Sequence, residues 1–312
     1  MEYINMNYIV MDLEWNQSST GQEDTVHTLP FEIVEIGAVK LNSDRKMISE
    51  FSKLVKPQVY KTMHQITGKL IHLQMQQLES GELFPDVYNS FSEWFGDNPF
   101  FCTWGPLDLT ELQRNIRYYN LPALSQGPFA FLDVQKLFSI AFEDAQSRRS
   151  LEYAIDFLNI QKDIPFHRAF SDAYYTAKIL ALIPENVLSR VSYDVFHLPA
   201  NQKSEVHVVF DNYSKYISRA FADKSSALAD REVMSTKCYI CGKSTHRRIK
   251  WFTTNNKHYY SVSQCDEHGL MKSKVRLRKS ESGQLYVMKT QKFINQKQAD
   301  QIKYKLDHLK RQ

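Results

Sequence analysis

Apolar and polar positions in the first 185 residues alternate between runs typical of strands and runs with helical spacing. Three strand-like segments come first, and the short connections between them predict antiparallel neighbours. They are 8–15 (YIVMDLEW), 31–41 and 48–57. Helical spacing then appears at 84–96, 107–120, 150–160 and 171–183, with a short apolar strand at 99–105. Ser150 and Ser171 are candidate N-caps. This order predicts a mixed α/β sheet with helices on its faces.

The pattern changes after residue 185. Apolar residues three or four apart over 208–228 predict an amphipathic helix that connects two domains. Further on, alternation predicts a hairpin over 246–264, a second hairpin over 272–290 and a basic helix over 295–312. We therefore expect three parts, which are a domain over 1–185, a helical connector over 186–234 and a small α+β domain over 235–312.

Charge divides the chain in the same way. Residues 1–185 carry 24 acidic and 15 basic side chains, whereas residues 235–312 carry 18 basic and 5 acidic ones. An acidic body with a basic end predicts a polyanionic partner for the end, although a solvated basic surface has the same composition. The four cysteines are spaced unlike a disulfide framework, and no segment reads as a membrane span or a leader, so we expect a cytoplasmic protein without membrane contact.

Two acids interrupt the first strand. Asp12 and Glu14 are two positions apart, so they share one face of the strand, while Met11 and Leu13 share the other. Two like charges on a buried strand are costly unless a cation neutralises them, and oxygen ligands suit Mg²⁺ or Mn²⁺. This motif alone is a weak signal, because D-x-E is common by chance.

Two later segments add titratable residues at element ends. Asp108 begins the helix that follows the strand at 99–105, and Asp172 lies in the first turn of the helix at 171–183. His167 precedes Asp172 by five residues in a loop. Each of these, taken singly, also reads as an ordinary cap or surface residue.

Together and in this order, the four acids and the histidine resemble the DEDDh branch of the DEDD 3′–5′ exonucleases. The segments DLEWN, FEIVEIGAVKL, ITG, TWGPLDL and HRAFSDA look closest to the KapD and ERI-1-like exonucleases, over roughly residues 6–183. A tyrosine branch would need Tyr at position 168, where this chain has Arg168. The resemblance implies an RNase H-like fold, with a mixed five-stranded sheet flanked by helices.

The resemblance also implies a mechanism. Asp12, Glu14, Asp108 and Asp172 would hold two Mg²⁺ or Mn²⁺ ions at the scissile phosphate, and His167 would act as general base for the attacking water. The expected reaction is hydrolysis of single-stranded nucleic acid from its 3′ end, with release of nucleoside 5′-monophosphates. Likeness to the ERI-1-like group favours RNA over DNA.

The basic end contains a second metal motif. Cys238 and Cys241 are followed by Cys265 and His268, in the pattern C-x2-C-x23-C-x2-H. Paired ligands separated by a hairpin-length spacer are typical of a closed, structural zinc site. We therefore expect one Zn²⁺ in a ribbon-like domain.

Cations and aromatic residues alternate around that motif, as they do on surfaces that bind single-stranded nucleic acid. The candidate binding residues are Arg247, Arg248, Lys250, Trp251, Lys274, Arg276 and Arg278. The aromatic residues could equally form the core of a small domain. Two other functions therefore stay open, a catalytically weak adaptor that binds nucleic acid through its zinc domain, and a basic domain that recognises an acidic protein.

Overall fold

The computed structural model describes residues 7–20, 24–71 and 73–309. The chain forms two compact units, the first made of Met1–Leu124 with Phe129–Asp194 and the second of Ser125–Pro128 with Val195–Gln312. Among the residues described, no helix is both long and apolar enough to cross a membrane. With Val195 in the second unit, that unit begins well before residue 235, where the sequence predicted the start of the last domain.

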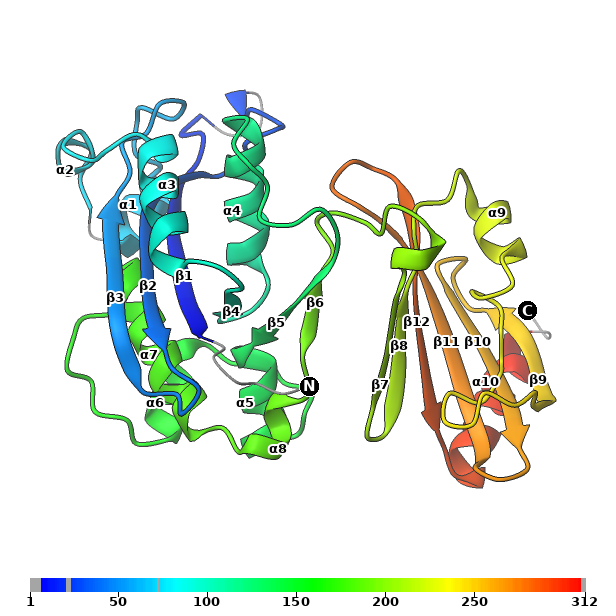
Figure 1. Cartoon of the computed structure of the whole chain (residues 1–312). Coiled ribbons are helices and arrows are strands. Elements are labelled where there is room, and N and C mark those ends of the chain that lie inside the picture. Colours follow the sequence, from blue (N-terminus) through cyan, green and yellow to red (C-terminus); the bar gives the residue numbers. More distant parts are fainter. Residues whose placement is uncertain (1–6, 21–23, 72, 310–312) are drawn as a thin grey trace. The chain divides into compact units, whose positions relative to one another are not determined.

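A six-stranded sheet in the order β3-β2-β1-β4-β5-β6 forms the centre of the first unit (Figure 1). Its strands are β1 (Tyr8–Asn16), β2 (Glu32–Leu41), β3 (Met47–Leu54), β4 (Phe100–Thr103), β5 (Phe129–Asp133) and β6 (Ser192–Asp194). The first three are antiparallel neighbours, as predicted, and β4 and β5 continue the sheet in parallel with β1. The short β6 adds a sixth strand beyond the predicted end of the domain.

Helices cover both faces of this sheet. They are α1 (Gln65–Ile71), α2 (Met75–Leu78), α3 (Phe84–Phe95), α4 (Leu107–Tyr118), α5 (Val134–Phe142), α6 (Leu151–Phe157), α7 (Ala169–Leu182) and α8 (Glu185–Leu188). Ile9 and Met11 of β1 pack with side chains of α3 and α4, whereas Tyr8 and Val10 pack with α5, α6 and α7. The alternation along β1 thus fixes which face meets which helices.

One predicted cap is confirmed and one is wrong. The Ser150 hydroxyl accepts a hydrogen bond from the backbone nitrogen of Tyr153 at 3.2 Å, so it caps α6. Helix α7 begins at Ala169, two residues before the predicted cap Ser171, which lies inside the helix. The helix starts early because its first residues pack against β2.

The second unit is a six-stranded antiparallel sheet in the order β7-β8-β12-β11-β10-β9. Its strands are β7 (Val206–Phe210), β8 (Tyr213–Ile217), β9 (His246–Thr253), β10 (His258–Cys265), β11 (Gly269–Lys279) and β12 (Leu285–Phe293). The two predicted hairpins are β9/β10 and β11/β12. The predicted connecting helix over 208–228 is wrong, because this segment forms the β7/β8 hairpin and then the short α9 (Lys224–Ala229).

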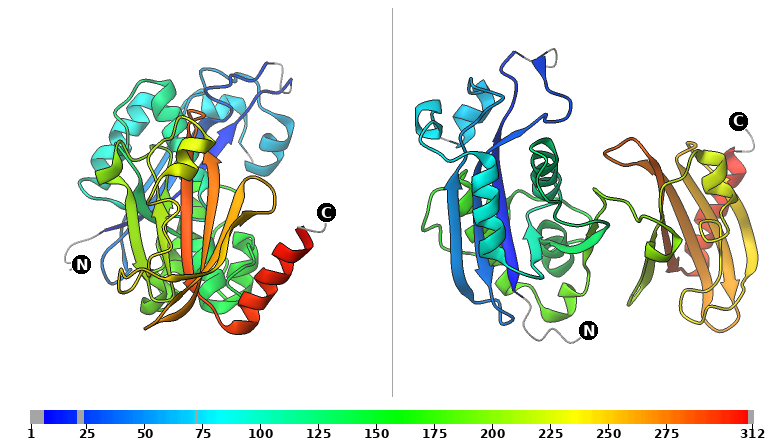
Figure 2. Two further views of the ribbon diagram at one scale, coloured as in Figure 1. Left: turned by 90° about the vertical axis from the view of Figure 1, so that its right-hand side faces the viewer. Right: turned by 45° about the horizontal axis from the view of Figure 1, so that its top comes forward.

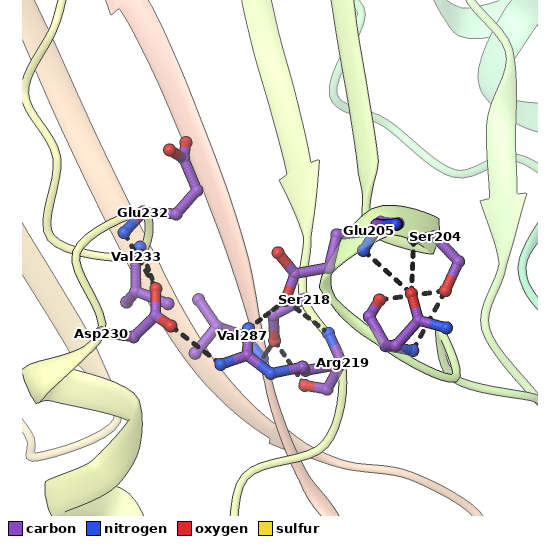
Figure 3. A network of polar contacts seen from close by, with 10 residues as sticks. Ser204, Glu205, Ser218, Arg219, Asp230, Glu232, Val233 and Val287 are labelled. Atoms are coloured by element: carbon purple, nitrogen blue, oxygen red, sulfur yellow. Dashed lines mark hydrogen bonds and ion pairs between the residues drawn. The ribbon is translucent and has the colours of Figure 1, made fainter.

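Hydrogen bonding ties this segment to the second sheet. Arg219 donates from Nη1 to Glu205 Oε1 at 2.6 Å and from Nη2 to Asp230 Oδ2 at 3.0 Å (Figure 3). The Ser218 hydroxyl accepts from the backbone nitrogen of Val287 in β12 at 2.8 Å. The Glu205 side chain is 1% exposed, so Arg219 supplies the charge that makes its burial tolerable. A short 3-10 turn, η2 (Gln202–Ser204), precedes Glu205.

Each face of the second sheet has its own apolar cluster. Val233, Ala227 and Tyr259 belong to the cluster on the α9 side. On the other face, Ala299, Ile302 and Leu306 of α10 (Gln296–Leu309) pack on Ile249, Val262 and Leu270. The basic helix predicted over 295–312 is α10, which Figures 1 and 2 show in red.

Candidate active site and zinc centre

The acids of β1 face helix α7. Asp12 and Glu14 continue the Tyr8–Val10 face of the strand, and their neighbours in β2 are Gly37 and Glu35. Strand β4 pairs with β1 only as far as Val10, so β4 does not run beside the two acids. The end of β1 and the first turn of α7 bring three acidic side chains together.

Asp12, Glu14 and Asp172 each offer a carboxylate oxygen, and these oxygens all lie within 4.8 Å of one another. Asp108 lies outside this group of three, buried in the first turn of α4, and its charge acts on Asp12. All four predicted acids therefore lie at one end of the sheet. His167 is exposed in the loop before α7, with a φ of 63°, and its backbone nitrogen lies 3.4 Å from Asp172 Oδ1.

The acids of this cluster repel one another when they are ionised, and a bound cation would offset that repulsion. Burial raises the pKa of Asp12 well above its ordinary value, and the charges of Asp108, Glu14 and Asp172 raise it further. Burial and neighbouring acids likewise raise the pKa of Glu14 to about 8, against the opposing effect of Arg168. These acids can all be ionised at neutral pH only if cations neutralise them.

Burial has the same effect on the other two acids, with less force. It raises the pKa of Asp108 to about 7, although backbone hydrogen bonds from Asp108 itself and Leu13 oppose the shift. It raises the pKa of Asp172 to about 6, against the hydrogen bond from the His167 backbone. A set of four carboxylates with this environment fits hard divalent cations such as Mg²⁺ or Mn²⁺.

Sequence reasoning missed an ion pair beside the cluster. Arg168 donates to both oxygens of Glu35, from Nη2 to Oε1 at 2.7 Å and from Nε to Oε2 at 3.0 Å. The Glu35 side chain is 1% exposed, and the backbone nitrogen of Ala169 adds a hydrogen bond at 3.3 Å. The signal in the sequence was an acid, Glu35, within the apolar run that forms β2; the strand register places it directly opposite Glu14.

Asn16 organises the loop on the other side of the acids. It is fully buried at the end of β1, and its side-chain nitrogen donates to the backbone oxygens of Tyr60 and Thr62 at 3.0 and 2.9 Å. Its side-chain oxygen accepts from the His64 backbone nitrogen at 2.9 Å. The loop that leads into α1 is therefore fixed to the strand that carries Asp12 and Glu14.

The predicted zinc ligands also come together. The Cys238 sulfur lies 3.7 Å and the Cys265 sulfur 3.6 Å from His268 Nδ1, and the Cys241 and Cys265 sulfurs are 3.7 Å apart. In a tetrahedron, zinc–sulfur bonds of about 2.3 Å and zinc–nitrogen bonds of about 2.0 Å place two sulfurs roughly 3.8 Å apart and a sulfur and a nitrogen roughly 3.5 Å apart. The donor set and its spacing are therefore compatible with Zn²⁺.

The seven residues predicted to bind nucleic acid do not form one surface. Lys274, Arg276 and Arg278 alternate along β11 and share the face that meets α10. Trp251 packs in the apolar cluster on the opposite face, where its indole nitrogen donates to the Met234 backbone oxygen at 3.0 Å. Arg247, Arg248 and Lys250 lie exposed on β9, the last strand at one edge of the sheet.

Comparison with known proteins gives one family. Residues 9–180, more than half of the 312-residue chain, match the model of a protein family described as Exonuclease. No curated protein has a sequence that matches the chain.

Several solved structures are similar to parts of the chain. The nuclease domain of 3′hExo, described as a DEDDh family member bound to rAMP, is 16% identical, with 57% of this chain and 91% of that one covered and a TM-score of 0.49. Pop2p of S. pombe, in a form with Mg²⁺ and Mn²⁺ bound, is 15% identical, with 56% and 82% covered and a TM-score of 0.43. Exonuclease I of E. coli, in complex with an oligonucleotide, is 14% identical, with 76% and 60% covered and a TM-score of 0.43.

Proposed function

Because the chain belongs to the exonuclease family, we propose that it removes nucleotides from the 3′ end of single-stranded nucleic acid and releases nucleoside 5′-monophosphates. The predicted enzyme class, an exonuclease, is confirmed by the family match over residues 9–180. The DEDDh type is part of the proposal and rests on the order and spacing of the motif residues. The observation that carries the proposal is the convergence of Asp12, Glu14 and Asp172 within 4.8 Å, at a place where their pKa values are raised.

We assign the four carboxylates to the binding of divalent cations. Asp12 is the candidate to contact two ions, because the charges of all three other acids, Glu14, Asp108 and Asp172, act on it. Two such ions, when bound, supply the positive charge that stabilises the attacking and leaving oxygens of a phosphodiester. The chain contributes a rigid frame, since Asp12 and Glu14 are on a central strand and Asp108 is on the first turn of α4.

His167 is the proposed general base, because it lies in the loop that leads directly to Asp172. A histidine side chain in general can accept a proton from water near neutral pH, which is the role proposed here. The ring is exposed, so it can reach a water molecule at a bound substrate. Arg168, the next residue, is held by Glu35 and so fixes the base of this loop.

The finer parts of the function rest on the motifs. The proposed preference for RNA over DNA comes from the resemblance of the motifs to those of the ERI-1-like exonucleases. In the second unit, Cys238, Cys241, Cys265 and His268 are proposed to hold one structural Zn²⁺, because all four positions around the ion are filled by protein side chains.

The direct test uses single-stranded RNA and DNA oligomers of matched sequence, labelled at the 5′ end. Each is incubated with the full chain in Mg²⁺ or Mn²⁺, beside an Asp12→Ala variant. We expect a ladder that shortens from the 3′ end and is absent with the variant, and the relative rates on the two strands identify the substrate.

Failure to shorten either strand in either metal would contradict the proposed activity. It would favour the alternative function, an adaptor that binds nucleic acid through its basic zinc domain. Equal shortening by the Asp12→Ala variant would instead show that the activity does not depend on Asp12.

A further inference from the structure

One face of the second sheet is only partly covered. Helix α10 packs on it through Ala299, Ile302 and Leu306, against strands β9, β10 and β11. Lys272, Lys274, Arg276 and Arg278 alternate with core residues along β11, so their side chains share this face with α10. The result is a row of four cations beside the helix.

A groove lies between this row and α10. It has a volume of about 360 Å³ and is lined by Lys272 and Lys274 of β11, Lys305 of α10, and the aromatic side chains of Phe252 and Tyr260. The nitrogens of Lys272 and Lys274 both lie 5.4 Å from the centre of the Tyr260 ring, and Tyr260 packs on Phe252 with ring centres 5.8 Å apart. Cations and an aromatic platform therefore line the same groove.

Three of these cations have no acidic partner among the residues that the structure describes. Within the described part of the chain, Lys272, Lys274 and Arg276 make no ion pair, and the buried Nε of Arg276 has no hydrogen-bond acceptor. Burial lowers the pKa of Lys272 and of Lys274, and the neighbouring cations Arg276 and Lys305 lower both further. Repulsion between neighbouring cations without acidic partners destabilises the folded state, and a bound anionic ligand reduces that repulsion.

We infer that this face binds single-stranded nucleic acid, with Lys272, Lys274 and Arg276 contacting successive phosphates and Tyr260 stacking on a base. The inference rests on the proposed substrate class, and it gives the second unit a binding surface separate from the carboxylate site. A single strand fits because its bases are free to stack, whereas those of a duplex are already stacked on each other. The groove favours this ligand over an acidic peptide because Tyr260 and Phe252 add an aromatic wall to the cations.

The structure revises the predicted surface at several positions. Lys274, Arg276 and Arg278 remain, and Lys272, Tyr260 and Lys305 join them. Trp251 leaves the surface, because its ring packs on the α9 side of the sheet.

The experiment measures binding by the full chain carrying Asp12→Ala, with no divalent metal added, so that no RNA is degraded. The probe is a labelled single-stranded RNA of about 20 nucleotides, longer than the roughly 4–16 that one small domain covers. Affinity is measured by fluorescence anisotropy between about 50 and 200 mM salt, the range over which counterion release is readily seen. The test variant is Lys274→Gln/Arg276→Gln, which keeps the aliphatic stems.

We expect the test variant to bind at least about tenfold more weakly at the lowest salt, and the slope of log K against log salt to fall by about 1.4, which corresponds to two phosphate contacts on a single strand. The matched control is Lys224→Gln/Arg231→Gln, which removes two exposed cations from the α9 side. Unchanged affinity and slope in the test variant, or an equal loss in the control, would overturn the inference. Thermal unfolding of each variant checks that the fold is kept.

A second variant and a competitor examine the stacking contact. Tyr260→Leu should weaken binding of RNA while leaving binding of inorganic polyphosphate unchanged, and an equal effect on both would contradict a base on Tyr260. Polyglutamate of matched charge should displace the RNA poorly. Displacement as efficient as that by unlabelled RNA would overturn the inference in favour of an acidic protein partner.

The two proposals fail in different ways. An inactive wild-type chain would contradict the exonuclease and leave this measurement untouched, because the measurement needs no turnover. Normal degradation of RNA together with a test variant that binds like its parent would contradict only the second surface.

Discussion

At the scale of single residues, Glu35 and Arg168 show how the chain keeps a fifth acid beside four others. Glu35 is buried directly opposite Glu14, and Arg168 neutralises it through two hydrogen bonds. Arg168 also lowers the pKa of Glu14, against the larger effect of burial. Arg168 thus has a positioning role, because His167 precedes it directly in the chain and Ala169, the first residue of α7, follows it directly.

His167 gives the first prediction. His167→Ala removes the proposed proton acceptor and no carboxylate, so we expect kcat on single-stranded RNA to fall by about 10²- to 10⁴-fold while Mn²⁺ affinity stays largely intact. Initial rates and a calorimetric Mn²⁺ titration measure the two quantities. His207→Ala, an exposed histidine on β7 in the other unit, is the matched control. A parallel loss of rate and of metal affinity in His167→Ala would show that the histidine supports the metal site instead.

At the scale of elements, the contact between β2 and α7 decides the geometry of the site. Gly37 stands opposite Asp12 in the register, and a Cβ atom at this position would overlap the backbone of Ala169 and Phe170. The absence of a side chain therefore allows the first turn of α7, with Asp172, to approach the sheet at the level of Asp12. Bringing the third carboxylate to the other two depends on this close approach.

Gly37→Ala tests that contact. The added methyl group meets backbone, which cannot move without shifting the start of α7, so we expect a loss of about 1 to 3 kcal/mol in the free energy of unfolding, or more, together with a large loss of exonuclease activity. Urea unfolding and the oligomer assay measure the two effects. Gly127→Ala is the control, because no atom lies within 4 Å of the Cβ position there. Wild-type activity in Gly37→Ala would show that α7 does not need this approach.

The segment over 206–217 shows why one element was predicted wrongly. Its apolar residues match helical spacing, but Val206, Val208 and Phe210 also match the period of a strand. Asp211 and Asn212 form the two-residue connection of a hairpin, and β8 finds hydrogen-bonding partners on β12, about 70 residues later in the chain. Pairing with a distant strand decided the outcome, and no local pattern contains that information.

At the scale of the whole molecule, the two units differ in the interactions that stabilise each of them internally. The first has large apolar clusters on both faces of its sheet. The second has smaller clusters, and the cysteine and histidine side chains join the turn before β9 to the end of β10. A metal at that junction would contribute directly to folding of the second unit.

The third prediction follows from this difference. We expect about one zinc per chain after exhaustive dialysis, and none in a Cys238→Ser/Cys241→Ser variant. Calorimetry should show two unfolding transitions, of which the variant lowers only one by several degrees, because the metal stabilises only the unit that binds it. Cys102→Ser, a buried cysteine of the first unit, is the control for loss of a thiol elsewhere. Zinc retained by the double variant would contradict the assigned ligands.

The sequence by itself determined the local features of this protein. The period of apolar residues defined most strands and helices, D-x-E placed Asp12 and Glu14 on one face, and the spacing of the cysteines predicted their cluster, because these features depend on neighbours within a few residues. Tertiary structure alone decided the start of α7 at Ala169, the Arg168–Glu35 pair, the β7/β8 hairpin, and the separation of Trp251 from the cations of β11. Each of these depends on contacts between segments far apart in the chain, whose packing and hydrogen bonding outweigh local preference.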